Sequence, residues 1–150
     1  MKLQDQVSSL ELSKRLKELG VKQESFWCWV EDERKSTEFP AGWILENTQS
    51  IKSINIVDFY SAFTVAELGE MLPEELRKDN VHLSLLIQKI HIGNKKFPDY
   101  GKWGVCYLNM PSSSNVLHSE VDTEADARAK MLIYLIENKL VDVKTLTNQP

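Results

Sequence analysis

The sequence predicts an α+β fold in which helices cover an antiparallel sheet, and three observations support this prediction. Two segments near the chain ends repeat apolar residues at helical spacing. Between them, runs rich in aromatic and β-branched residues alternate with a period of two. Short turn-forming stretches separate these runs, so neighbouring strands can join as hairpins. We expect a single domain over residues 1–150: an antiparallel sheet of four to five strands, packed against an N-terminal helix, a short middle helix and a long C-terminal helix.

Length and composition agree with one globular unit. A domain of 150 residues buries about 70% of its unfolded surface, and a hydrophobic content of 42% can fill that core. The net charge of −4, from 22 acidic and 18 basic residues, provides no general attraction for nucleic-acid phosphates. The N-terminus lacks the apolar region of a signal peptide, and no apolar run approaches the ~20 residues of a membrane span. These features predict a cytoplasmic protein.

Neither cysteine belongs to a recognisable metal or redox motif. Cys28 and Cys106 are far apart in the sequence, and each lies inside an apolar run. The sequence has no CxxC pair. We expect two reduced, buried thiols that pack as small hydrophobic side chains.

The N-terminal helix is predicted over residues 8–19, where leucines recur on one face and charged residues cover the other. Ser8 or Ser9 can cap its start. Gly20 follows directly and is the expected residue just beyond a helix end.

An aromatic hairpin follows. Residues 25–31 predict a strand in which Phe26, Cys28 and Val30 point one way and two tryptophans the other, so both faces need cover. Residues 32–38 read as a charged loop, and residues 43–46 as the returning strand. A third extended run is expected over residues 51–59.

The middle helix is predicted from Thr64, because Thr64 and Glu67 fit a capping box, and Pro73 ends it by Leu72. Residues 73–76 suggest one further helical turn with proline at its start. Two longer strands are expected next, over residues 82–92 and 103–109, with loops at 93–101 and 111–114.

The C-terminal helix is the clearest element of the sequence. Thr123 and Asp126 form a near capping box, and apolar residues continue to about Leu140 over a broad arc. Such a helix is buried on more than one side, either beneath the rest of the domain or in an oligomer interface. The predicted order is therefore α-β-β-(β)-α-β-β-α.

Three of these segments together resemble a known family. They are SLELSKRLKELGVKQES at 9–25, AFTVAELGEMLPEEL at 62–76 and EADARAKMLIYLIENKL at 124–140. With the aromatic strands between them, they are similar to small hypothetical proteins encoded by tailed bacteriophages and prophages. The resemblance spans most of the chain and is weakest over residues 89–109. It implies a bacterial host cytoplasm and an accessory gene rather than a virion shell protein, and it carries no activity or site residues.

No catalytic or metal-binding motif stands out. His82, His91 and His118 form neither an HExxH motif nor a closely spaced pair, so no metal or other cofactor is expected. The sequence contains no GxSxG, P-loop or dinucleotide-binding glycine pattern. Its carboxylate runs read as solvated faces rather than acid–base machinery.

The segment 89–103 is a candidate ligand loop. Four lysines (89, 95, 96 and 102) against Asp99 give it a local charge of about +3, and aromatic rings lie among them. Basic groups hold phosphates while rings stack on bases, so this composition suits a nucleotide-like ligand. The candidate ligand-binding residues are Lys95, Lys96, Tyr100, Lys102 and Trp103. The structural alternative is a hairpin loop with solvated lysines and rings that turn inward onto the core.

Trp27, Trp29 and Trp43 are candidate interface residues. Rings on both faces of one hairpin exceed what a single core requires, and tryptophan is favoured at interface hot spots. They predict a homo-oligomer contact or the wall of a pocket between protomers. The alternative is that they build the core.

These observations favour a non-catalytic phage accessory protein that acts by binding a host protein or a small nucleotide-like molecule. One alternative is a nucleic-acid-binding regulator that uses the N-terminal helix, although the recognition helix expected after Val21 is missing. Another is an enzyme whose site is assembled without a local motif.

Overall fold

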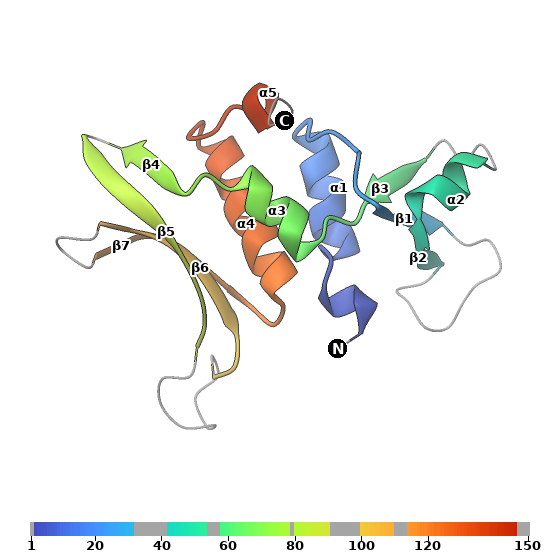
Figure 1. Ribbon diagram of the computed structural model, residues 1–150, viewed down its shortest axis with the longest axis horizontal. Helices are drawn as coiled ribbons and strands as arrows, with labels where there is room; N and C mark the ends of the chain where they lie inside the picture. Colours follow the sequence, from blue (N-terminus) through green and yellow to red (C-terminus); the bar gives the residue numbers. More distant parts are fainter. Residues whose placement is uncertain are drawn as a thin grey trace.

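The computed structural model describes residues 2–31, 42–53, 58–78, 80–90, 100–109 and 114–146. Its strands form two antiparallel sheets, with α1, α3 and α4 lying between them (Figure 1). The helices are η1 Leu3–Asp5, α1 Leu10–Glu18, α2 Thr48–Ser53, α3 Val65–Met71, α4 Glu124–Glu137 and α5 Val143–Leu146. The strands are β1 Trp27–Glu31, β2 Trp43–Asn47, β3 Phe59–Ser61, β4 Glu75–Lys78, β5 Val81–Lys89, β6 Trp103–Asn109 and β7 Ser114–Val121.

The α+β class and the antiparallel pairing are confirmed, but the strands do not share one sheet of four to five strands. One sheet has the order β2-β1-β3 and the other the order β4-β5-β6-β7. Sequence patterns identify strands and their hairpin neighbours, whereas the joining of distant strands depends on what packs between them. Here α4 contacts β6 and β7, and α1 contacts both α4 and β3, so the helices keep the two sheets apart.

The main core lies between the four-stranded sheet and α4. Seven residues of α4 are buried, and they are Ala125, Ala127, Ala129, Met131, Leu132, Ile133 and Leu135. From the sheet, Leu83, Val105 and Tyr107 point into the same cluster. The predicted burial of this helix on more than one side is therefore met within the chain, by α1, α3 and the sheet.

The three-stranded sheet has apolar packing on both faces, as the alternation in β1 predicts. Trp29 packs with Val7 and Ala62 on one face. Cys28 and Val30 pack with Ile51 of α2 on the other. Cys28 and Cys106 are both buried thiols outside any disulfide, in agreement with the sequence.

The ends of α1 and α3 lie within two residues of their predicted positions. Thr64 Oγ1 accepts a hydrogen bond from the Glu67 amide at 3.2 Å, and a Glu67 carboxylate oxygen accepts one from the Thr64 amide at 2.6 Å. Gly20 directly follows the C-cap of α1 and has a φ of +88°. Residues that carry a Cβ atom rarely adopt this backbone conformation.

Four elements differ from the prediction. Residues 51–53 belong to α2 rather than to an extended run, because Asn47 Oδ1 accepts from the Gln49 amide at the start of this turn. Residues 75–78 form strand β4, not a helical turn, since Leu76 pairs with Leu83 across a tight turn in which Asn80 has a φ of 62°. Strand β7 and helix α5 had no predicted counterpart.

Candidate binding site

The predicted ligand loop, residues 89–103, is described only at its two ends, over residues 89–90 and 100–103. Lys95 and Lys96 lie outside the described residues, and the prediction for them stays untested. Tyr100 and Lys102 are half-buried, and Trp103 opens β6 opposite Lys89 of β5. The Lys89 ammonium lies 5.8 Å from the centroid of the Trp103 ring. The Trp103 side chain packs against the main core.

The space beside Trp103 has an acidic character. A cavity of about 390 Å³ has Lys89 and Trp103 in its wall, together with Asp5, Asp122 and Glu124. Among the described residues of this wall, three carboxylates accompany one lysine, and one of the three, Glu124, is also paired with Arg128. This charge balance disfavours a phosphate group at the described part of the predicted site.

The three tryptophans have different environments. Trp29 is only 4% exposed, and its Nε1 donates to the backbone oxygen of Ser8 at 2.9 Å. Its ring belongs to the chain's own core and offers no face to a partner, so the interface prediction does not extend to Trp29. Trp27 and Trp43 are half-buried and pack around the same cluster.

Lysines of α1 lie over the aromatic rings of the three-stranded sheet. The Lys14 ammonium is 4.6 Å from the Trp43 ring centroid and 5.4 Å from that of Tyr60. The Lys17 ammonium is 4.6 Å from the Tyr60 ring. The two rings are 5.4 Å apart and tilted by 50°. We call Lys14, Lys17, Trp43 and Tyr60 the lysine–aromatic face.

Electrostatic contacts distinguish the basic residues of α1. Lys17 also donates to an Asp58 carboxylate oxygen at 3.1 Å and to the Phe59 carbonyl at 2.9 Å. Arg15 is instead paired with Glu18 and Glu137, which raise the pKa of its guanidinium. Within the described part of the chain, no carboxylate pairs with Lys14, so its charge remains available at the surface.

Sequence reasoning identified Trp43 but missed Lys14, Lys17 and Tyr60. The spacing of three residues between the lysines places them one turn apart on α1, which was a readable signal. The third member, Tyr60, comes from β3 and reaches the face only because β3 pairs with β1.

The residue types that bind metal ions are dispersed over the part of the chain that the structure describes. No three His, Cys, Asp or Glu side chains there lie close enough together to hold a metal ion. His82 is exposed on β5. His91 and the side chain of His118 are outside the described residues.

Compared with protein-family models, curated proteins and solved structures, the chain matches none of them. None of the described helices has both the length and the apolar character that crossing a bilayer requires.

Proposed function

We propose that this chain is a non-catalytic binding protein whose lysine–aromatic face recognises an acidic surface on a partner protein. The observation that carries the proposal is the placement of two ammonium groups 4.6 Å from the Trp43 and Tyr60 ring centroids. In line with the resemblance to phage and prophage proteins, we propose that it is an accessory protein and that the partner is a host protein.

The physical argument concerns both the rings and the charges. Tryptophan and tyrosine bury large areas with little loss of conformational freedom, which is why they are frequent at interface hot spots. Attraction to the ring faces favours the observed lysine positions before a partner arrives. Lys17 is already paired with Asp58, so the charge that would orient an acidic partner toward this face comes mainly from Lys14.

A homo-oligomer through this face is less favourable than a different partner. A two-fold interface presents the same patch from both subunits. Two copies of the face would therefore bring lysines toward lysines, and like charges at an interface oppose association.

A nucleotide-like or single-stranded nucleic-acid ligand is the second candidate, because lysines beside stacking rings suit phosphates and bases. A separate role for α1 as a recognition helix has less support. Ser13 and Leu16 of α1 are fully buried, and the chain after Gly20 leads to β1 rather than to a second helix.

The test is affinity capture from nuclease-treated host lysate, followed by direct binding of the captured partner in a salt series. The double variant K14Q/K17Q should weaken binding about 10- to 100-fold, since charged hot-spot pairs contribute on this scale. The charge-matched control K139Q/K144Q, on exposed positions just beyond α4 and in α5, should bind like the wild type.

Equal retention of the partner by K14Q/K17Q and by the wild type would refute this assignment of the face. Binding of an added single-stranded oligonucleotide, lost in K14Q/K17Q and with no protein captured from the lysate, would instead establish the second candidate. Matching urea midpoints for the wild type and both double variants would show that the difference does not arise from folding.

A further inference from the structure

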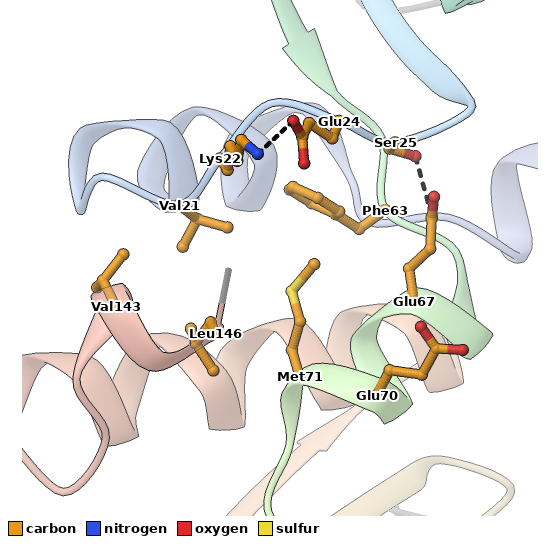
Figure 2. A pocket seen from close by; sticks show the side chains of 10 residues that line it. All are labelled: Val21, Lys22, Glu24, Ser25, Phe63, Glu67, Glu70, Met71, Val143 and Leu146. Carbon is orange, nitrogen blue, oxygen red and sulfur yellow. Dashed lines mark hydrogen bonds and ion pairs between the residues drawn. The ribbon is translucent and has the colours of Figure 1, made fainter. Parts of the chain in front are cut away.

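A separate cavity of about 210 Å³ lies where the linker after α1 meets α3 and α5 (Figure 2). Val21, Met71 and Leu146 point into it from these three segments, and Phe63 closes one side (Figure 2). Its volume is below the ~300–1,000 Å³ of pockets for drug-sized ligands. The wall therefore suits a short hydrocarbon group.

Three carboxylates also line this cavity, on the side away from Val143 and Leu146 (Figure 2). Glu24, Glu67 and Glu70 line the cavity together with a single base, Lys22. Counting three acids against one base gives the rim a charge of −2. The Lys22 ammonium pairs with Glu24 at 2.5 Å, while Glu70 is exposed.

Glu67 is a fixed anion at this rim. Besides closing the capping box with Thr64, its carboxylate accepts from the Ser25 hydroxyl at 2.9 Å and from the Phe26 amide at 3.2 Å. These donors hold the carboxylate in place without neutralising its charge. The negative potential is therefore built into the junction between α3 and β1.

We propose that this cavity binds a small organic cation with a short hydrocarbon chain, an alkylammonium ion. Its methylene groups would pack against Met71, Val143 and Leu146, and its ammonium group would lie among the rim carboxylates. The charge of −2 favours a cation over a neutral or anionic molecule of the same shape. This site shares no residue with the lysine–aromatic face and does not depend on its function.

The experiment is an NMR titration of the full chain with pentylammonium, pentanol and pentanoate at constant ionic strength. Methyl signals of Met71, Val143 and Leu146 should shift with pentylammonium at the lowest concentration, with pentanol at a higher one, and least with pentanoate. Shortening pentylammonium to propylammonium should weaken binding by about fourfold per methylene removed.

Charge variants test the rim without disturbing the core, because Lys22 and Glu70 are exposed. E70Q should weaken pentylammonium binding about two- to fivefold and leave pentanol unchanged. K22Q should strengthen pentylammonium binding by a similar factor. A gain in affinity cannot result from poor folding of the variant. The control E74Q removes an exposed acid that does not line the cavity, and it should have no effect.

Pentanoate binding as strongly as pentylammonium would overturn the proposal, as would methyl shifts located elsewhere in the molecule. The proposal would also fail if E70Q and K22Q changed the affinity in the same direction. None of these results bears on the K14Q/K17Q capture experiment, so the two proposals can fail independently.

Discussion

The carboxylate of Asp126 joins the starts of two helices. The backbone amide of Asp126 donates to Thr123 Oγ1 at 3.1 Å, which is the half of the capping box expected from the sequence. The carboxylate does not complete the capping box of α4. It accepts a hydrogen bond of 2.8 Å from the backbone amide of Ser9, the N-cap residue of α1. Burial raises the pKa of this carboxyl, and the hydrogen bond from Ser9 only partly opposes the shift.

Asp126→Asn should therefore stabilise the protein at neutral pH. A raised pKa means that the folded state binds the proton more tightly than the unfolded state, so the charged form costs stability above the folded pKa. The amide keeps an oxygen for Ser9 but carries no charge. We expect D126N to gain about 0.5–1 kcal/mol at pH 7, and this advantage to shrink as the pH falls and to vanish below about 4, where the carboxyl is protonated in both states.

The measurement is urea unfolding over that pH range. Asp126→Ala is the matched control, because it removes the acceptor and should cost about 1 kcal/mol relative to D126N. If D126N is less stable than the wild type at pH 7, the attraction of the charge to two helix N-termini outweighs its burial.

Tyr107 makes one buried polar contact in the main core. The residue is fully buried, and its hydroxyl donates to the Pro73 carbonyl at 2.6 Å, between α3 and β4. Burial also raises the pKa of this hydroxyl, so it stays protonated as a donor. The bond ties the middle of β6 to the turn that sequence patterns assigned to a helix.

Tyr107→Phe should lower the free energy of unfolding by about 1–3 kcal/mol, because it leaves the Pro73 carbonyl without this donor. The urea concentration at the unfolding midpoint should fall. The dependence of the unfolding free energy on urea concentration should stay constant. Tyr134→Phe, on a side chain that is 39% exposed, should change little. Equal effects of the two substitutions would mean that the hydroxyl of Tyr107 contributes nothing specific.

At the scale of elements, α3 packs against α4 through Gly69. A Cβ added there would lie 2.8 Å from a guanidinium nitrogen of Arg128, which is the far end of a flexible side chain held by Glu124. Gly20 differs, because a Cβ there would meet only an ordinary contact at 3.9 Å, while its φ is +88°. The two glycines are thus constrained by different physical causes.

Gly69→Ala should change stability by less than about 0.5 kcal/mol, since the helical preference of alanine offsets the displacement of Arg128. Gly20→Ala should cost about 1 kcal/mol or more, because alanine resists a positive φ. Thermal unfolding of both variants provides the comparison. A loss at Gly69 as large as that at Gly20 would show that Arg128 cannot move aside.

At the scale of the whole molecule, the two sheets differ in how much core supports them. Strand β6 lies inside its sheet, and its residues from Gly104 to Tyr107 are buried. Val105 and Tyr107 belong to the main core. Strand β2 is an edge strand whose five residues are all half-buried. Among the described residues, the two clusters on the three-stranded sheet contain three buried residues each.

Amide hydrogen exchange should therefore be slowest in β6 and α4 and clearly faster in β2 and α2. Segments with few buried contacts open by local fluctuations, whereas the main core opens only with global unfolding. Low concentrations of urea should accelerate exchange in β6 but leave β2 nearly unchanged. Equally slow exchange in both would show that the two sheets unfold as one unit.

Local patterns predicted the helices α1, α3 and α4, the β1–β2 and β5–β6 hairpins, and the capping of α3. Each depends on residues a few positions apart, such as Thr64 with Glu67, or on alternation along one strand. The candidate site was predicted less well. Trp43 came from its residue type alone, whereas Tyr60 and Lys14 meet it only after β3 pairs with β1 and α1 packs across the sheet.

The sequence by itself determined the α+β class, the principal helices, the hairpin neighbours and the burial of both cysteines, because periodicity and caps act over short distances. Tertiary structure alone decided that the strands divide into two sheets, that Trp29 is core, and that Asp126 serves α1. These outcomes depend on which surfaces meet across the helices between the sheets. Such contacts join residues distant in the chain, and no local pattern encodes their pairing.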